Sequence, residues 1–392
     1  MEFGFTPEQE AFRLEVREFV KDRLPEDWLL THWKYGFDFY SDLDELGPVA
    51  RMMSKELGAK GWLSIPWPRQ YGGQEGSYID QLIVAEELAA QHCPGLEIFG
   101  AVIAPVLLEY GTEEQKKRLL PGISAGTEFW CESLSEPDAG SDLASLKTLA
   151  LLQGDHYVIN GQKVWTSGAH GADRVFLLAR TDPKSVKHRG LGAFLVDIKT
   201  PGITISPLIN AVNEHEFNEI FFDDVRVPQE DLLGDGNSGW RVTMRLLDYE
   251  RTFCVPFYAE AQYYLENLIE YARQAAHLNP ALRERVAQQL AECKAARSLT
   301  YRAASLADKG LPFSIEAAMS KVFGSELNQR VAALGMEIVG PHSALVEGSK
   351  WAALDGQAAW RYLRALGNTL EMGTSEVDRI VLAQRGLGLP RE

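Results

Sequence analysis

Cysteine is scarce in this sequence, and the pattern of the four that are present argues against two kinds of site. Cys93, Cys131, Cys254 and Cys293 are scattered along the 392 residues, and none belongs to a CxxC pair. Neither a zinc site nor a disulfide framework is indicated, so we expect no bound metal. Scattered thiols suit a reducing compartment, and we therefore expect a cytoplasmic protein.

Basic residues and long apolar runs are also in short supply. The 39 Lys and Arg residues face 55 Asp and Glu residues, which leaves a net charge of −16. Because phosphate surfaces are bound by clustered Lys and Arg, neither nucleic acid nor an anionic membrane is expected as the main partner. No stretch approaches the roughly 18 uninterrupted apolar residues of a membrane span, and the acidic start of the chain lacks the features of a signal peptide.

What is present is an ordinary globular composition, long enough for two or three domains. Residues 1–127 read as a helical domain. Thr6, followed by proline, predicts a helix start, and the segments 79–92 and 99–110 are nearly all apolar, as buried helices are. The Pro- and Gly-rich stretch 66–73 predicts a loop.

Strand periodicity begins at about residue 128 and lasts to about residue 236. Asn160-Gly161 predicts a tight hairpin turn. Gly or Pro separates most of the further strand candidates, which lie at 174–180, 191–198, 202–208 and 219–227. Since no helical segment intervenes, we expect a compact antiparallel β domain.

Helical periodicity returns after this domain, in Ala- and Leu-rich segments at 240–270, 281–308, 313–339 and 356–370. The predicted fold class is therefore α+β. It consists of an N-terminal helical domain (1–127), a middle antiparallel β domain (128–236) and a C-terminal helical bundle (237–392).

Two motifs of the β domain suit a polar, planar ligand. The first, Ser135-Glu-Pro-Asp-Ala-Gly140-Ser141-Asp142, predicts a turning backbone whose N–H groups can bind a ring or a pyrophosphate. The second, Lys163-Val-Trp165-Thr166-Ser167-Gly168, places an aromatic ring beside two hydroxyls at a strand end. Taken singly, a domain-entry loop and a core tryptophan are the simpler interpretations.

Together with the tail Gly373-Thr-Ser-Glu-Val-Asp-Arg379 and Leu387-Gly-Leu-Pro390, these motifs resemble those of the acyl-CoA dehydrogenase family, over essentially the whole chain. The resemblance implies FAD, bound without a GxGxxG motif between the β domain and the C-terminal helices of two subunits. It also implies α,β-dehydrogenation of an acyl-CoA thioester to the trans-2-enoyl-CoA. A carboxylate removes the α-proton, the β-hydride passes to flavin N5, and donors reach the thioester oxygen. The implied electron acceptor is a protein such as an electron-transfer flavoprotein.

The position of the base departs from the family's most familiar pattern. That position, immediately before Gly-Thr-Ser, is Met372 here, and a thioether cannot accept a proton. A subset that includes the isovaleryl-CoA and long-chain enzymes carries the base on the first long helix of the C-terminal domain, where this sequence has Glu250. We therefore expect Glu250 to be the base, with a solvated or ion-paired glutamate as the alternative interpretation. Glu371 is adjacent to the usual position, but one residue rotates a helical side chain by about 100°, so it should point away.

The remaining site residues follow from the same resemblance. Expected cofactor-binding residues are Leu134, Ser135, Ser141, Trp165, Thr166, Ser167, Thr374, Ser375 and Glu376. Expected substrate-binding residues are Ser141, Asp248, Arg251, Met372 and Gly373, with the Met372 backbone N–H directed at the thioester oxygen. Asp248 and Arg251 are three residues apart, so an intrahelical salt bridge is their simpler interpretation.

A second departure concerns the partners. The Arg and Phe-Gly pair that the family usually carries is missing from 271–280, and its usual Gln-x-x-Gly-Gly run reads Glu337-Ile-Val-Gly340-Pro341. This pattern resembles the heteromeric enzymes of bacterial steroid and bulky acyl-chain degradation. We expect a tetramer, either a hetero-tetramer with a homologous subunit or a homotetramer with altered FAD contacts. The alternative functions are a flavin oxidase or monooxygenase of the same fold, or a partner subunit of a heteromeric dehydrogenase.

Overall fold

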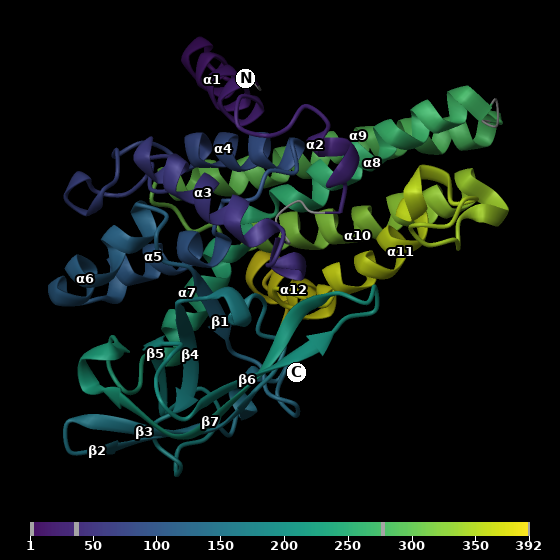
Figure 1. Ribbon diagram of the computed structural model, residues 1–392. Coiled ribbons are helices and arrows are strands. Elements are labelled where there is room, and N and C mark those ends of the chain that lie inside the picture. Colours follow the sequence, from purple (N-terminus) through teal and green to yellow (C-terminus); the bar gives the residue numbers. More distant parts are fainter. Residues whose placement is uncertain (1–3, 35–38, 276–278, 391–392) are drawn as a thin grey trace. The chain divides into compact units, whose positions relative to one another are not determined.

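The computed structural model describes residues 4–34, 39–275 and 279–390 (Figure 1). Its contacts divide the chain into two compact units. The helical unit comprises Met1–Phe37, Tyr78–Cys93 and Arg251–Glu392, and the sheet unit comprises Asp38–Ser77 and Pro94–Glu250. Helices from the first 127 residues therefore belong to both units, and the domain boundaries at 127/128 and 236/237 stay predictions.

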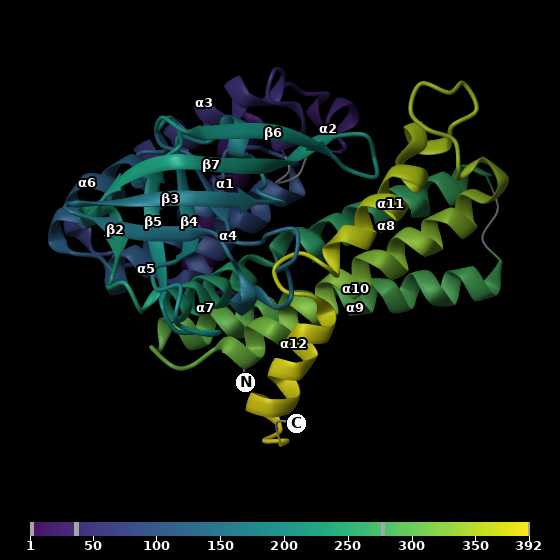
Figure 2. The same cartoon turned by 90° about the horizontal axis from the view of Figure 1, so that it is seen from below.

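The helical unit is built around three long helices, α8, α9 and α10, which pack against one another (Figure 2). Its helices are α1 (Pro7–Lys21), α2 (Trp28–Thr31), α4 (Tyr78–Ala90), α8 (Val255–Ala275), α9 (Pro280–Asp308), α10 (Ser314–Val339), α11 (Gln357–Asn368) and α12 (Ser375–Val381). Short turns are η6 (Arg251–Phe253), η7 (Gly340–His342), η8 (Ala353–Gly356) and η9 (Leu382–Gly386), the last of which is a π turn.

The start of α1 agrees with its sequence signal. Thr6 caps the helix by accepting the Gln9 N–H at 3.2 Å, and the Gln9 side chain accepts the Thr6 N–H in return. Pro7 occupies the first helical position, where its missing N–H leaves no bond unmade. Arg13 and Arg17 then pair with the buried Glu87 of α4, at 2.6 and 2.8 Å, so these ion pairs join the two helices.

The prediction of one helix over 240–270 is wrong. Helix α7 (Gly239–Glu250) ends at Glu250, the turn η6 follows, and α8 begins at Val255. Pro256 is the second residue of α8, a position in the first helical turn that tolerates a residue without an N–H. The proline was therefore the sequence signal for a new helix start.

The sheet unit combines one large sheet with flanking helices. Its helices are α3 (Leu46–Ala59), α5 (Ile98–Tyr110), α6 (Glu113–Ser124) and α7, and its short turns are η1 (Phe39–Asp42), η2 (Arg69–Tyr71), η3 (Leu143–Ser145), η4 (Ala169–Gly171) and η5 (Gln229–Asp231). Its strands are β1 (Trp130–Ser133), β2 (Leu149–Gln153), β3 (His156–Lys163), β4 (Arg174–Arg180), β5 (Leu191–Asp197), β6 (Ile203–Ile209), β7 (His215–Pro228) and β8 (Leu232–Leu233).

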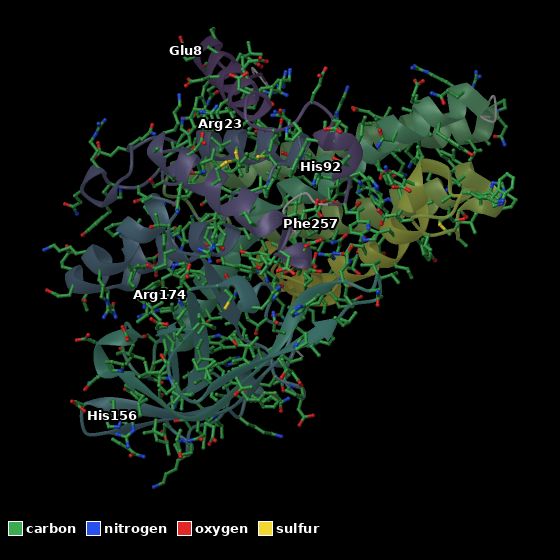
Figure 3. All side chains as sticks on the ribbon, viewed as in Figure 1. Glu8, Arg23, His92, His156, Arg174 and Phe257 are labelled. Atoms are coloured by element: carbon green, nitrogen blue, oxygen red, sulfur yellow. The ribbon has the colours of Figure 1, made fainter. Side chains whose placement is uncertain are left out.

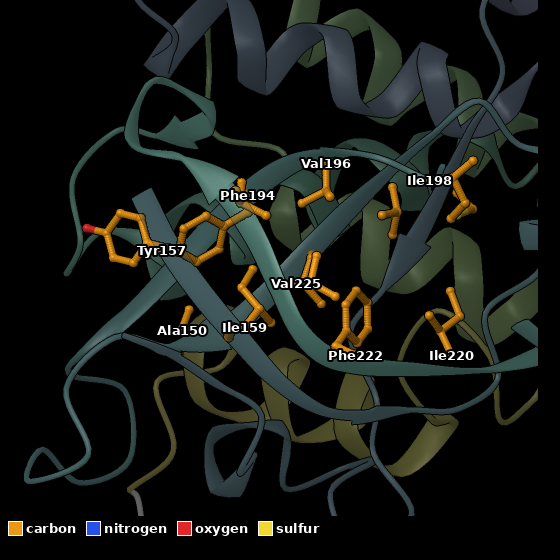
Figure 4. Packing of buried hydrophobic residues seen from close by; sticks show 14 of the residues in the cluster. Ala150, Tyr157, Ile159, Phe194, Val196, Ile198, Ile220, Phe222 and Val225 are labelled. Atoms are coloured by element: carbon orange, nitrogen blue, oxygen red, sulfur yellow. The ribbon is translucent and has the colours of Figure 1, made fainter. Parts of the chain in front are cut away.

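The strands follow the order β6-β7-β3-β2-β4-β5-β8, and β1 pairs with β4 off this path. Most neighbouring pairs are antiparallel, as predicted, but β1 and β2 both run parallel to β4. Alternate residues of the strands point into one core, where Phe194, Ile220 and Val225 are fully buried (Figure 4). The predicted α+β class, with helical, sheet and helical regions in sequence, is confirmed.

The predicted turn at Asn160-Gly161 is wrong. Both residues lie inside β3, at an irregular point of its pairing with β7. A Cβ on Gly161 would meet Thr148 Oγ1 at 2.4 Å, so glycine is needed there for a close approach. The connection between β2 and β3 is instead Gly154-Asp155, with Gly154 at φ +66°.

Two further findings bear on the expectations from sequence. The predicted loop 66–73 is irregular except for η2, which covers Arg69–Tyr71. Across the described ranges, no helix has the length and apolarity needed to cross a membrane.

Candidate active site

The first predicted cofactor motif lies at the end of β1 in the sheet unit, and a buried lysine supports it. Lys163 is fully buried; its Nζ donates to the Leu134 carbonyl at 2.7 Å and pairs with Glu136 Oε1 at 3.0 Å. Burial lowers the pKa of Lys163 to about 8, although Glu136 opposes this shift. The Ser135 carbonyl accepts the Val164 N–H at 2.9 Å. The motif is thereby connected to the strand that leads to Trp165.

Glu136 serves as the anchor of this loop. Its carboxylate also accepts the N–H groups of Lys147 at 2.7 Å and Thr148 at 2.8 Å. Burial raises the pKa of Glu136, but Lys163 and these hydrogen bonds outweigh it, so the pKa is lowered overall. Glu136 is therefore an anion with several partners.

The second motif presents an aromatic ring to the outside. Trp165 follows the end of β3, has φ +61°, and is 60% exposed. Its ring meets Phe217 edge-on, with centroids 5.8 Å apart. Thr166 is buried, exchanges backbone hydrogen bonds with Asn218 at 3.0 Å in both directions, and places its hydroxyl 3.2 Å from that of Ser133. A planar ring with one open face, beside a buried hydroxyl, suits stacking on a flavin.

Ser141 and Ser167 differ in exposure. Ser141 is exposed, and Ser167 is half-buried. Next to Ser141 lies a hollow of about 480 Å³, lined by residues that include Asp142, Lys147 and Lys187. The two lysines give this hollow a basic character that the chain as a whole lacks.

Glu250 is the last residue of α7, and carboxyl groups lie around it in the sheet unit. Its side chain is half-buried, and Asp248 is buried. Burial, followed by the charges of Glu250 and Glu97, raises the pKa of Glu132 on β1 well above its usual range. Sequence reasoning missed Glu132; the signal was an acidic residue in the apolar run Phe129-Trp-Cys131.

The second half of the predicted site lies in the helical unit, at the loop before α12. Met372 and Gly373 both have positive φ, +57° and +88°. Arg251 Nε donates to the Met372 carbonyl at 3.1 Å, and Lys321 Nζ donates to the Gly373 carbonyl at 2.6 Å. Within the described chain, the N–H groups of Met372 and Gly373 have no acceptor. The loop therefore has two carbonyls held by cations and two N–H groups available as donors.

Two carboxylates near this loop have separate roles. Arg251 pairs with the fully buried Asp378 of α12 at 3.2 Å. Burial lowers the pKa of Lys321, while the charge of Asp378 opposes this shift. Glu371 is held by the Asn368 side chain at 2.8 Å and by Arg364 at 3.4 Å, so its carboxylate is tied to α11, although Glu371 itself lies in a turn rather than a helix. Lys321 and Asp378 were missed, because each lies far in sequence from the motif that it supports.

The Thr374-Ser375-Glu376 segment begins α12. Thr374 caps the helix by accepting the Val377 N–H at 3.2 Å, and Glu376 is exposed. The Ser375 hydroxyl is buried, and no hydrogen-bond partner for it exists among the residues that the structure describes. Ser375 and Glu376 help to line a hollow of about 410 Å³, together with Gln329 and Arg330 of α10.

The predicted residues thus form two sets. The sheet unit holds Leu134, Ser135, Ser141, Trp165, Thr166, Ser167, Asp248 and Glu250, and the helical unit holds Arg251, Met372, Gly373, Thr374, Ser375 and Glu376. Residues 276–278, part of the stretch where the family's Arg and Phe-Gly motif is missing, lie outside the described residues. In the sheet unit, the exposed indole of Trp165 and the buried hydroxyl of Thr166 are groups that can stack on and hydrogen-bond to FAD. In the helical unit, the Ser375 hydroxyl, which has no partner among the described residues, is a further group that could bind it.

Comparisons with known proteins cover the whole chain. Three family models match in order: the acyl-CoA dehydrogenase N-terminal domain over residues 6–127, the middle domain over 131–225 and the C-terminal domain over 237–387. Acyl-CoA dehydrogenase IpdE1 of Mycobacterium tuberculosis is 36% identical over 393 residues, which cover 98% of each protein.

Solved structures are also similar to this chain over its whole length. The Tcur3481–Tcur3483 steroid ACAD superposes with a TM-score of 0.89 at 31% identity, over 100% of both chains. The ChsE4–ChsE5 complex from Mycobacterium tuberculosis superposes with a TM-score of 0.86 at 32% identity, again over 100% of both chains.

Proposed function

The chain belongs to the acyl-CoA dehydrogenase family, and from this membership we propose that it oxidises a bulky acyl-CoA thioester to the trans-2-enoyl-CoA with Glu250 as the base. As a member, it is an FAD-dependent oxidoreductase that acts on acyl-CoA. The choice of Glu250 rests on Met372, a residue that cannot take a proton at the position before Gly373. Glu371 is held by α11, which leaves the carboxylate at the end of α7 as the candidate.

Each of these residues has a proposed role in proton transfer or in substrate binding. Glu250 removes the α-proton, and the Met372 N–H, free of other acceptors within the described residues, donates to the thioester oxygen as negative charge develops there. Asp248 and Ser141 would contact the substrate. Arg251 would contact it as well, although its described hydrogen bonds go to the Met372 carbonyl and Asp378.

FAD, when bound, supplies the hydride acceptor at flavin N5. Its holders in the sheet unit would be Leu134, Ser135, Ser141, Trp165, Thr166 and Ser167, and in the helical unit Thr374, Ser375 and Glu376. Trp165 is expected to stack on the ring system, and the hydroxyls to orient it. The lysines beside the hollow at Asp142 suit a phosphate-bearing part of CoA.

Replacing the base tests the central claim. Glu250→Gln in the holoenzyme should lower kcat by about 10²- to 10⁴-fold or more, since an amide cannot take a proton. FAD content and acyl-CoA binding, followed by the flavin absorbance, should stay close to those of the wild type. Glu371→Gln is the matched control and should retain turnover. If Glu371→Gln abolishes the reaction and Glu250→Gln does not, the assignment is wrong.

The proposed assembly is a tetramer that includes a second, homologous polypeptide. The missing Arg and Phe-Gly motif supports this, as does Pro341, which replaces the second glycine of the family's usual run. Two of the similar structures carry paired names, Tcur3481–Tcur3483 and ChsE4–ChsE5. The name "steroid ACAD" supports a ring-bearing acyl chain as the substrate class, and an electron-transfer flavoprotein is the proposed acceptor.

Flavin stoichiometry tests the assembly. Two copies of this chain would leave the FAD pyrophosphate short of a cation, and a charge-assisted hydrogen bond is worth about 1.5–3 kcal/mol, or roughly one to two powers of ten in affinity. We expect two FAD per four chains when the homologous subunit is co-expressed. A stable homotetramer holding four FAD would refute the heteromer but not the dehydrogenase.

A further inference from the structure

Three glutamates from three different elements of the sheet unit lie close enough for Glu97 and Glu250 to act electrostatically on Glu132. Helix α5 packs against both β1 and α7. Glu97 caps α5, Glu132 lies on β1 opposite Phe176 of β4, and Glu250 ends α7. None of the three follows another closely in sequence, so only the packing of these elements brings their carboxyls together.

The hydrogen bonds of the Glu97 carboxylate hold neighbouring segments of the fold together. Its carboxylate accepts the N–H groups of Phe99 at 3.2 Å and Gly100 at 2.6 Å, and the Tyr40 hydroxyl at 2.9 Å. It also accepts a hydrogen bond from the backbone of Trp130. Burial nevertheless raises the pKa of Glu97 to about 7. Its role is to join α5 to β1.

Glu132 has no such role. Its Oε1 is buried, and no hydrogen-bond partner for it is found in the described parts of the chain. Glu132 lies two residues before Leu134, the first of the expected cofactor-binding residues. A carboxyl with one oxygen buried away from any donor is disfavoured as an anion, because nothing replaces the water that this oxygen has lost.

Cations on the surrounding elements are engaged elsewhere. Arg174 of β4 pairs with Glu128, and Arg245 of α7 bonds Glu109 of α5 at 3.0 Å and the Tyr249 hydroxyl at 2.9 Å. On η4, His170 contacts the Tyr40 carbonyl and Asn218. On β1 itself, burial is the main cause that raises the pKa of the Cys131 thiol, so this neighbour is neutral.

We propose that Glu132 is a positioning residue for the base: it stays neutral while Glu250 is ionised, so the two carboxyls hold one proton between them. This rests on the proposed role of Glu250. The repulsion between two nearby carboxylates is mutual, so the pair loses its protons in two separated steps. Burial and the charge of Glu250 both raise the pKa of Glu132, which therefore keeps the remaining proton. A neutral Glu132 can donate a hydrogen bond to the carboxylate that takes the α-proton.

The pH dependence of kcat/KM in the holoenzyme tests this pairing. The profile of the wild type should show two ionisations, one for each proton that the Glu132–Glu250 pair loses. Glu132→Gln keeps a neutral donor, so the lower ionisation should remain and the upper one should vanish. Glu132→Met removes the hydrogen-bond donor, so the lower ionisation in the kcat/KM profile should move up by about one to two pH units. At acidic pH, kcat/KM should therefore fall about 10- to 100-fold below that of the wild type, and it should recover at higher pH.

A matched control and the base variant separate the outcomes. Glu128 is also a carboxyl whose pKa is raised by burial, but it faces Arg174, so Glu128→Gln should keep the wild-type profile. A profile of Glu132→Gln that retains both ionisations would overturn the pairing while leaving the base assignment intact, provided that Glu250→Gln is inactive. An active Glu250→Gln enzyme would overturn both.

Discussion

The two units each support a predicted ligand-binding loop with a buried lysine under a backbone carbonyl. In the sheet unit, Lys163 donates to Leu134 at 2.7 Å; in the helical unit, Lys321 donates to Gly373 at 2.6 Å. The surroundings differ. Lys163 balances the single carboxylate Glu136, whereas the loop above Lys321 is also held by Arg251, which pairs with Asp378.

Because the sheet-unit loop is held by one cation and the helical-unit loop by two, the two loops should differ in how well they tolerate the loss of a lysine. A loop that depends on one ion pair loses its support when either partner is removed. A loop held by two cations on consecutive carbonyls keeps one of them. The same arrangement turns both carbonyls of Met372 and Gly373 toward the cations and leaves their N–H groups available, which is what an oxyanion-binding turn requires.

Replacing the two lysines should show the largest effect. Lys163→Met leaves Glu136 buried without its cation, and removing one partner of a buried pair destabilises by about 3–5 kcal/mol. Lys321→Met should cost less, about 1–3 kcal/mol for an unsatisfied buried carbonyl, because Asp378 keeps Arg251. Urea unfolding at pH 7 measures both. Equal losses would show that the second cation gives the helical unit no advantage.

Substitutions at Met372 test whether its backbone N–H, in the loop of the helical unit, is the donor to the thioester oxygen. Met372→Gly keeps the N–H and suits φ +57°, so turnover should stay within a few-fold of wild type. Met372→Pro removes the donor and cannot adopt that φ, so kcat should fall by at least about 10²–10³-fold. Thermal unfolding confirms that each variant is folded. Comparable rates for the two variants would mean that this N–H is not the donor.

The smallest effect concerns pH, to which the two units should respond in opposite directions. In the helical unit, burial and then the charge of Arg361 lower the pKa of His92 to about 3 (Figure 3 labels His92). The unfolded chain therefore binds a proton below about pH 6.5 that the folded chain does not, and stability falls as the pH drops from 6.5 toward 3. In the sheet unit, Glu97 has a raised pKa of about 7, so stability falls as the pH rises from 4.5 to 7.

Single substitutions separate these two responses. Each group contributes at most about 1.4 kcal/mol per pH unit within its window. His92→Gln should flatten the loss of stability on acidification below pH 6.5. Glu97→Gln should flatten the loss between pH 4.5 and 7, after allowance for its missing helix cap. Thermal unfolding at half-unit pH steps measures both slopes, and slopes of the same sign for the two groups would contradict the assignment.

Local signals in the sequence predicted much of this molecule correctly. The Thr6 cap, the helices near 79–92 and 99–110, and the strand at 174–180 depend on residues within a few positions of one another, and the structure confirms them. Asn160-Gly161 misled because the same dipeptide suits a turn and an irregular strand pairing. Only the approach of Thr148, the residue before β2, decides between them.

The sequence by itself determined the family, the α+β order of its regions, and the absence of a proton acceptor at Met372, since each is carried by contiguous motifs. Tertiary structure alone decided what surrounds those motifs. Lys321 lies 52 residues before Gly373, and Glu132 lies far in sequence from Glu250, yet each acts on its distant counterpart. Burial and charge at such sites depend on which elements pack together, and no local pattern of residues encodes that.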